Sequence, residues 1–133
     1  MIEAPLLEKI IEFQTKQIVN DWPVYFAIEN ENCVVGWADV SPIANPRLCH
    51  RGTLGMGVLK THRGQGLGSQ LLGSCLQHAL KIGLEKVELT VYSENTAAIA
   101  LYKKFGFLQM GYIKNYRKLD GKYFDSIEME KFL

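Results

Sequence analysis

The sequence predicts a single domain of mixed α/β class. The chain of 133 residues has the length of one ordinary domain, and its apolar (47%) and charged (22%) contents are close to the globular average. Stretches of helical and strand periodicity alternate along it, in the order helix, hairpin, strand, helix, strand, helix, hairpin. Because no repeat, low-complexity tract or linker interrupts this order, we expect one domain over residues 1–133.

The N-terminal third predicts helix followed by a β-hairpin. Apolar residues recur at helical spacing from Leu6 to Ile18, as in one amphipathic helix or a broken pair, and the pattern ends before Asn20. Residues 24–40 then hold two β-rich runs around a Glu-Asn-Glu-Asn stretch, which is typical of a turn. Residues 42–51 are expected to form a loop.

The middle of the chain predicts a strand, a glycine-rich turn and a helix. In residues 53–59, apolar side chains alternate with Gly55 and Gly57, so one strand face should pack while the other is almost bare and open to close approach. Apolar residues at helical spacing follow from Leu67 to Leu80, before a glycine at position 83 that can end the helix.

The C-terminal part predicts a strand, a short helix and a closing hairpin. Residues 86–92 alternate as a strand with three apolar residues on one face. Asn95 can cap the next helix, and Gly106 can end it. Two further strand-like runs meet at Asp120-Gly121, a strong signal for a two-residue hairpin turn.

The stretch Arg63-Gly64-Gln65-Gly66-Leu67-Gly68 joins a predicted strand to a predicted helix. It brings several backbone N–H groups, with few side chains, to the positive end of a helix, which favours an anion such as phosphate. A Walker loop is excluded because no Lys-Ser or Lys-Thr follows the last glycine, and the spacing GxGxG differs from the dinucleotide fingerprint. A tight turn that serves only chain reversal is the alternative.

Two spaced motifs resemble the GNAT superfamily, the acyl-CoA-dependent N-acetyltransferases. Arg63-x-x-Gly66-x-Gly68 matches the signature (Gln/Arg)-x-x-Gly-x-(Gly/Ala) in its strand-to-helix context. In SENTAAIALYKKFGF, Asn95 opens a helix and Tyr102 lies one turn before a Gly-Phe pair, as in the second shared segment of the family. The two motifs together are far more specific than either alone.

The resemblance extends in order over most of the chain, because VVGWADV is similar to the hairpin ahead of the family core and DGKYFDSIEMEKFL to its closing hairpin. It implies a small single-domain member of bacterial type, with a mostly antiparallel central sheet flanked by helices. The family usually has a strand before its first helix. Only Met1 to Pro5 precede the helix here, so we expect that strand to be absent, natively or by truncation.

The resemblance implies acetyl-CoA as co-substrate. Its pyrophosphate would bind N–H groups of the glycine turn, and its pantetheine arm would pair with the strand before the turn. The implied cofactor-binding residues are Gly57, Val58, Leu59, Arg63, Gly64, Gln65, Gly66, Leu67, Gly68, Ser69, Asn95 and Tyr102.

Tyr102 has the implied catalytic role of protonating the departing thiolate. A phenol with an ordinary pKa near 10 stays protonated at neutral pH and can donate. The alternative for Tyr102 is an aromatic side chain on the packing face of its helix. Asn95 is explained by helix capping, with or without a contact to the cofactor arm.

The acceptor implied by the resemblance is a primary amine that attacks the thioester directly, with no cysteine nucleophile. An alkyl amine with a pKa near 10.4 must lose a proton first, an uphill step of about 4.6 kcal/mol at pH 7. Many family members have a glutamate on the strand before the glycine turn, but Met56 is found there in this chain. The base is therefore a water relay or one of four side chains: Glu88, Asp39, His50 and Asp125.

Trp22, Trp37 and the loop of residues 42–51 are expected to border the acceptor pocket, although core packing explains both tryptophans equally well. The acceptor itself is open, from small molecules to peptides. Family members are often dimers, so a homodimer is compatible with the sequence.

Composition excludes several partners. Fifteen Lys and Arg nearly balance fourteen Asp and Glu, which argues against nucleic acid. Three cysteines without a CxxC pair suggest neither a metal site nor a disulfide framework. Because no secretion leader and no apolar run of about 20 residues are present, we expect no membrane and a cytoplasmic protein.

The leading hypothesis is thus an acyl-CoA-dependent N-acetyltransferase. A non-catalytic acyl-CoA-binding regulatory module of the same fold is the first alternative, favoured by Met56 and the short N-terminus. A nucleotide-phosphate binder of another class and a purely structural interaction domain are the others.

Overall fold

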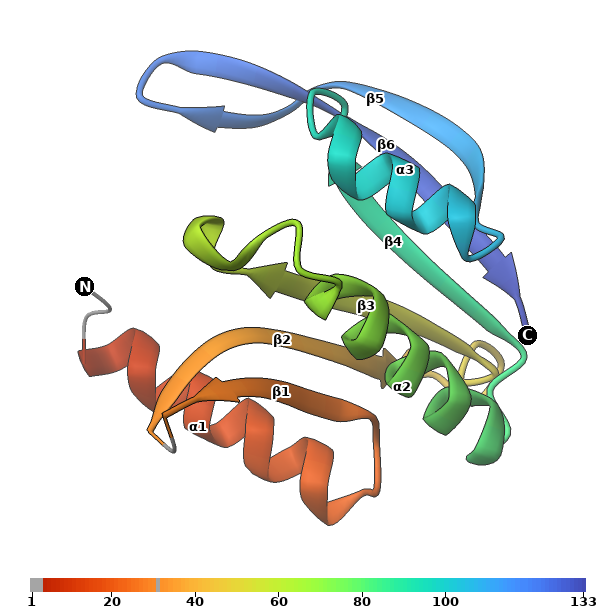
Figure 1. The fold of residues 1–133 in the computed structure, drawn as a ribbon. Coiled ribbons are helices and arrows are strands. Elements are labelled where there is room, and N and C mark those ends of the chain that lie inside the picture. Colours follow the sequence, from red (N-terminus) through yellow and green to blue (C-terminus); the bar gives the residue numbers. More distant parts are fainter. Residues whose placement is uncertain (1–3, 31) are drawn as a thin grey trace.

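The described residues form one sheet with helices on both of its faces (Figure 1). The computed structural model describes residues 4–30 and 32–133, and side chains from Glu12 onward. The elements in chain order are α1 (Ala4–Val19), β1 (Val24–Glu29), β2 (Cys33–Pro42), β3 (Arg51–Val58), the 3-10 helix η1 (Lys60–His62), α2 (Leu67–Lys81), β4 (Lys86–Tyr92), α3 (Thr96–Lys104), β5 (Leu108–Leu119) and β6 (Lys122–Phe132). This order confirms the predicted α/β class, with α1 as one continuous helix.

The strands lie in the order β1-β2-β3-β4-β6-β5. Every neighbouring pair is antiparallel except β3 and β4, which run parallel. This parallel ladder joins only Arg51–Thr53 to Lys86–Glu88, and beyond it the two strands diverge (Figure 1). The end of β3 therefore has a partner, β2, on one edge only.

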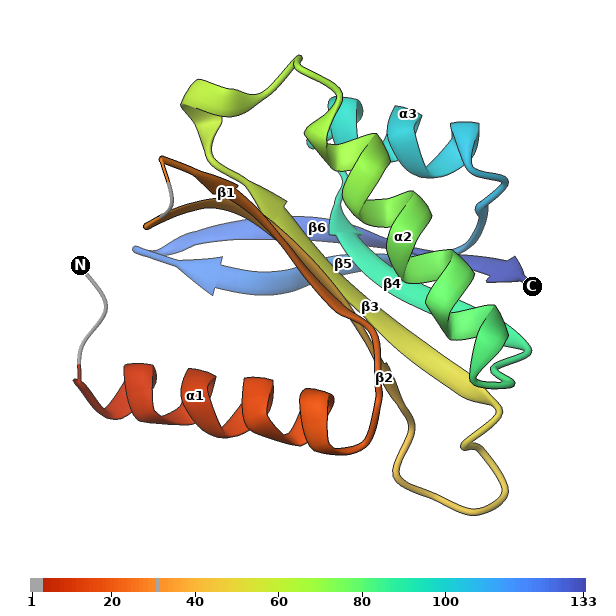
Figure 2. The ribbon, with the colours of Figure 1, turned by 60° about the horizontal axis from the view of Figure 1, so that its bottom comes forward.

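The main core lies between the sheet and the helices α2 and α3, which cover the same face (Figure 2). The helix α2 buries the apolar stripe that its sequence predicts, including Leu72, Cys75 and Ala79 at 0% exposure. The predicted alternation of β4 is also confirmed, because Val87, Leu89 and Val91 are buried. Leu80 was expected on this stripe but is 59% exposed, since α2 turns it away from the sheet.

Turn and cap predictions are confirmed where local chemistry determines them. Asp120 and Gly121 both have positive φ (52° and 75°), as a two-residue hairpin turn with the native strand twist requires. Asn95 caps α3 through its side chain, and Gly106 follows that helix with φ of 94°. The predicted turn between β1 and β2 is present at Asn30 and Asn32, while Glu31 lies outside the described residues.

Helix α1 lies on the other face of the sheet, below β1 and β2 in Figure 2. The predicted apolar positions up to residue 11 lie outside the described side chains. Ile18 was expected on the apolar stripe but is 68% exposed. The buried residue is its neighbour Gln17, whose Nε2 donates to Pro23 O (3.0 Å) and Val40 O (3.1 Å) while its Oε1 accepts from Ser41 Oγ (3.0 Å). Helix α1 is thus fastened to the sheet by an amide.

Replacing Gln17 with alanine should destabilise the protein by about 2 to 4 kcal/mol, because Val40 O loses its donor, Pro23 O retains only the Val40 N–H, and a void remains. Chemical denaturation measures this loss. Ile18→Ala, on the exposed side of the same helix, is the control and should cost less than about 0.5 kcal/mol. Equal midpoints for the two variants would contradict the anchoring role of Gln17.

Candidate active site

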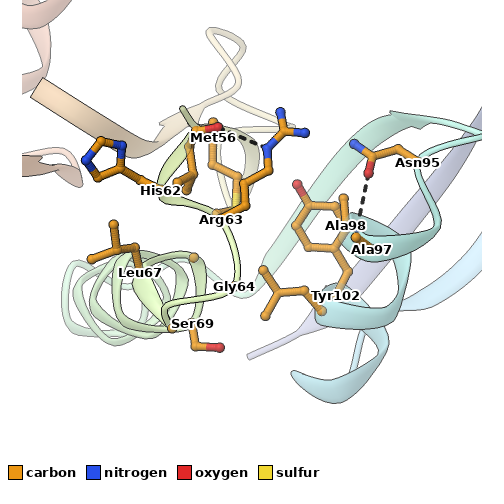
Figure 3. Close-up of a pocket in the computed structure, with 15 residues that line it drawn as sticks. Met56, His62, Arg63, Gly64, Leu67, Ser69, Asn95, Ala97, Ala98 and Tyr102 are labelled. Carbon is orange, nitrogen blue, oxygen red and sulfur yellow. Dashed lines mark hydrogen bonds between the residues drawn. The ribbon is translucent and has the colours of Figure 1, made fainter. Parts of the chain in front are cut away.

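A cavity of about 360 Å³ lies where β3 and β4 have separated, between the start of α2 and helix α3. Figure 3 shows its walls: the end of β3, the glycine turn and one side of α3. The lining residues are Met56, Gly57, Val58, His62, Arg63, Gly64, Gly66, Leu67, Gly68, Ser69, Asn95, Ala97, Ala98, Leu101 and Tyr102. The two motifs singled out in the sequence therefore meet at one place.

The first two glycines of the turn are required by the backbone conformation and not by a lack of space for a side chain. Gly64 and Gly66 have φ of 78° and 81°, and a Cβ added at either would meet nothing within 4 Å. Gly68 serves packing instead, because its Cβ would lie 3.2 Å from Leu101 of α3. The turn thus needs glycine for two separate physical reasons.

The N-terminus of α2 is open. Gly66 is its N-cap residue and provides no side-chain cap. The first N–H groups of a helix have no partner within the helix, so those of Leu67, Gly68 and Ser69 remain for a ligand. Such groups at the positive end of a helix favour an anion, and all three residues line the cavity.

The free edge of β3 also faces the cavity. Leu59 N–H donates to Val35 O of β2 (2.8 Å). Because successive residues of a strand direct their N–H groups to opposite edges, the N–H groups of Val58 and Met56 point to the side that β4 has left. Arg63 Nε donates to Val58 O (3.2 Å), which ties the turn to this edge (Figure 3).

Tyr102 combines a packed ring with an available hydroxyl. The side chain is 7% exposed, and its ring centroid lies 5.7 Å from that of Phe107. Figure 3 shows the hydroxyl directed into the cavity. Among the described residues no group hydrogen-bonds it, and burial raises the pKa of Tyr102 above its usual value near 10. The phenol therefore holds its proton at neutral pH and can donate it to a ligand.

Asn95 lies near the Tyr102 hydroxyl in Figure 3, and its Oδ1 accepts the Ala98 N–H (3.2 Å). Of the twelve residues implied as cofactor-binding, all but Leu59 and Gln65 line the cavity. Sequence reasoning missed five lining residues: Met56, His62, Ala97, Ala98 and Leu101. Helical spacing could have found Ala98, four residues before Tyr102, and then Leu101, three residues after Ala98.

The glycine face of β3 admits close approach, as the sequence predicts, but the approaching groups are side chains of β2, so the face is not open. A Cβ at Gly57 would overlap the indole ring of Trp37, and a Cβ at Gly55 would lie 3.2 Å from Asp39 Oδ1. Trp37 and Asp39 are the cross-strand partners of these glycines in β2. The glycines therefore make room for two side chains of the neighbouring strand, on the side opposite α2.

Three of the four candidate bases are engaged or distant. Glu88 accepts two hydrogen bonds from Arg51 (2.5 and 2.7 Å), which holds its pKa below the usual range. Asp125 accepts from the Tyr112 hydroxyl and from Asn115 N–H, bonds that also lower its pKa. His50 is exposed in the 42–51 loop.

That loop lies at the start of β3, at the opposite end of the strand from the cavity (Figure 2). The loop is therefore remote from this cavity, and its place at the border of the acceptor pocket stays a prediction. Trp22 lies in the α1–β1 connection beneath Lys16, 5.7 Å from its Nζ. Trp37, in contrast, covers the end of β3 next to the cavity.

Asp39 is the remaining candidate. Its side chain is half-buried, and burial raises its pKa to about 6. Among the described groups none donates a hydrogen bond to its carboxylate. It is thus an unpaired carboxylate beside the strand that borders the cavity.

The model of the acetyltransferase (GNAT) family matches residues 3–107. An uncharacterised N-acetyltransferase, YokL, of Bacillus subtilis is 30% identical over 121 residues, which cover 87% of this chain and 65% of the relative. N-alpha-acetyltransferase 30 of Saccharomyces cerevisiae is 29% identical, covering 96% and 76%. The crystal structure of a ribosomal-protein-alanine N-acetyltransferase from Brucella melitensis superposes with a TM-score of 0.86 at 28% identity, covering 96% and 78%. The chain thus spans about two thirds of the Bacillus relative.

Asp39→Asn should stabilise the folded protein at alkaline pH. A folded-state pKa raised from 3.8 to about 6 means that the stability contributed by the neutral acid is complete below pH 4 and lost as the pH rises through 6. The amide avoids this loss, so the variant should be more stable by up to about 3 kcal/mol at pH 8. Denaturation between pH 4 and 8 measures the difference.

The matched control is Asp120→Asn in the exposed hairpin turn, where the amide suits the same positive φ of 52°. It should show no gain that grows with pH. Parallel stability curves for wild type and Asp39→Asn across this range would contradict the burial of a charge at Asp39.

Proposed function

The chain belongs to the acetyltransferase (GNAT) family, and we propose that it is an N-acetyltransferase that transfers the acetyl group of acetyl-CoA to a primary amine. The observation that carries this proposal is the meeting of an uncapped helix N-terminus, a free strand edge and the Tyr102 hydroxyl in one cavity. Each of these suits a different part of an acyl thioester with a phosphorylated arm. Within the described residues, no helix is long and apolar enough to cross a bilayer.

The cavity fits acetyl-CoA in a defined direction. The N–H groups at the start of α2 suit its pyrophosphate, and the edge of β3 at Val58 suits the amide groups of its pantetheine arm. The thioester would then lie near Met56, where a backbone N–H can polarise the carbonyl. Because Leu59 N–H is engaged by β2, pairing of the arm is expected at Met56 and Val58 rather than at Leu59.

Tyr102 is the proposed general acid. The amine nitrogen forms a bond to the carbonyl carbon, and the C–S bond breaks with its electrons left on sulfur. The Tyr102 hydroxyl donates its proton to that sulfur, so CoA leaves as the thiol. A proton from the amine nitrogen returns to Tyr102 through water, which completes the amide product.

The acceptor is proposed to be the amine of an amino acid, a peptide or another small molecule. Among the relatives, N-alpha-acetyltransferase 30 and a ribosomal-protein-alanine N-acetyltransferase support a peptide amine, and an L-amino acid N-acetyltransferase of Escherichia coli supports an amino acid. The second candidate function, a non-catalytic acyl-CoA-binding module, is favoured by Met56 in place of a carboxylate on β3. Release of CoA thiol in the presence of an amine distinguishes the two.

We also propose a cytoplasmic location and a homodimer. Three free cysteines among the described residues support a reducing compartment. The exposed edge strand β1, with Phe26 and Ile28 at 37% and 59% exposure, supports a contact between copies. Sedimentation measures the oligomeric state.

Acetyl-CoA at 100 times its dissociation constant should stabilise the wild type by about 2.7 kcal/mol, several degrees in thermal unfolding. CoA should act similarly, and ATP and NAD should not. Gly66→Glu should abolish the shift, because a carboxylate is placed at the anion site.

Gly83→Glu is the matched control, since Gly83 also has positive φ (92°) and open space around its Cβ but lies at the other end of α2. Both variants bear the same backbone strain, so only ligand binding separates them. An undiminished shift in a folded Gly66→Glu protein would contradict the proposed anion site.

Tyr102→Phe should lower kcat about 100-fold while the affinity for acetyl-CoA is unchanged, because the ring remains and only the donated proton is lost. Thiol release measures kcat, and calorimetry measures affinity. Tyr123→Phe, on the exposed hairpin, is the control and should behave as wild type. Equal kcat for Tyr102→Phe and wild type would leave Tyr102 with a packing role only.

A further inference from the structure

We infer that Trp37 and Asp39 form the amine-binding side of the site, where the Asp39 carboxylate accepts the proton that the acceptor ammonium must lose and the Trp37 ring contacts that ammonium. This inference rests on the proposed acetyl transfer. It assigns roles to two residues of β2, a strand that lines no part of the cavity described above.

The pairing register of β2 with β3 determines where the Trp37 and Asp39 side chains lie. Trp37 pairs with Gly57 and Asp39 with Gly55, so the two side chains flank the position of Met56. The Trp37 ring covers the Cα of Gly57, and Asp39 Oδ1 would lie 3.2 Å from a Cβ at Gly55. Both lie beside the β3 residue whose N–H faces the gap.

The two side chains are on the opposite side of the sheet from Tyr102. Ala38, between them in β2, is buried in the core beneath α2, with 0% exposure. Because successive side chains of a strand point to opposite faces, Trp37 and Asp39 face the side of α1. Because the β3–β4 ladder ends at Thr53 and Glu88, an acyl group placed between the diverging strands would be reached by Tyr102 from one face and by an amine from the other.

Other carboxylates on that face are less suited. Glu88 is bound by Arg51, and Glu130 by Lys86 (2.6 Å). Glu128 is on β6, beyond β4 and thus across the gap from Met56, in a separate hollow next to Glu88. Asp39 is both unpaired among the described residues and adjacent to the free part of β3.

Few groups can perturb the titration of Asp39. Its described neighbours are Gly55 of β3, Val24 of β1, and Trp37 and Ser41 along β2, none of which carries a charge. Cys75 of α2, across the sheet, is the ionisable group coupled to it, and burial raises the pKa of that thiol to about 12, so the thiol is neutral. The side chains of α1 before Glu12 are not among those described.

A pKa of about 6 suits this role. The carboxylate is ionised at pH 7 to 8 and can bind an ammonium, yet it is a stronger base than an ordinary aspartate. Asp39 takes one proton from the R–NH3+ nitrogen, which then has a lone pair to attack the carbonyl carbon. Asp39 later releases that proton to solvent, so the net reaction gives amide, CoA thiol and one proton.

The pair also indicates an acceptor class. The Trp37 ring is 44% exposed, and the face of an indole attracts a cation. Together with an unpaired carboxylate it favours an aliphatic amine that arrives as an ammonium ion. An amine that is already neutral at working pH gains nothing from either group.

The test compares wild type, Asp39→Asn and the control Glu128→Gln with two nucleophiles, n-propylamine and hydroxylamine. Hydroxylamine is mostly neutral at pH 8 and needs no base, whereas propylamine is protonated. With propylamine at pH 8, kcat/KM should fall about 100-fold in Asp39→Asn. The bend that Asp39 gives the wild-type pH profile near 6 should be absent from the variant, whose rate should rise steadily toward pH 10 with the free amine. With hydroxylamine the variant should stay within about threefold of wild type, as should Glu128→Gln with both nucleophiles.

Two further readouts exclude a merely structural role. The deficit of Asp39→Asn with propylamine should shrink toward pH 10, where the free amine becomes abundant. Acetyl-CoA binding by calorimetry should be unchanged in Asp39→Asn, and Trp37→Leu should raise KM for propylamine more than it lowers kcat.

Equal losses with both nucleophiles, or none, would overturn the assignment of Asp39. If wild type released no thiol with either nucleophile beyond that seen without protein, despite binding acetyl-CoA, the proposed acetyl transfer would be overturned and this inference with it.

Discussion

The divergence of β3 from β4 is the constraint on which the rest of the structure depends. The two strands exchange a parallel ladder only over Arg51–Thr53 and Lys86–Glu88, after which the sheet opens. A strand that loses its neighbour inside a sheet has N–H groups without partners, an unfavourable arrangement unless a ligand or water supplies them. The helices α2 and α3 lie on one face of the sheet at this opening, and the cavity lies between the start of α2 and α3.

The opening also lies between two groups with opposite chemical roles, a proton donor and a proton acceptor. A group that gives a proton to sulfur should hold that proton at neutral pH, and Tyr102 does so because burial raises its pKa. A group that takes a proton should be ionised at neutral pH yet basic, as Asp39 is at about 6. Because they lie on opposite faces of the sheet, the two groups do not hydrogen-bond to each other, and each remains unpaired among the described residues.

Several residues around the opening lower the stability of the fold. Gly64 and Gly66 have backbone conformations that other residues adopt only with strain, and an ionised Asp39 is partly removed from water. The compensation lies elsewhere, in the fully buried stripe of α2 and in the Gln17 hydrogen bonds that fasten α1 to the sheet. The free N–H groups and the unpaired carboxylate are polar groups without hydrogen-bond partners among the described residues. Such groups are common at functional sites.

The sequence by itself determined the features that neighbouring residues decide. The strand-to-helix glycine turn, the Asn95 cap, the Asp120-Gly121 hairpin and the alternation of β4 follow from backbone conformation and periodicity, which act over a few residues. Only the tertiary structure decided that Gly55 and Gly57 accommodate Asp39 and Trp37, and that Gln17 rather than Ile18 is buried. These outcomes depend on cross-strand register and on how α1 packs against the sheet, and such contacts between distant segments leave no local pattern in the chain.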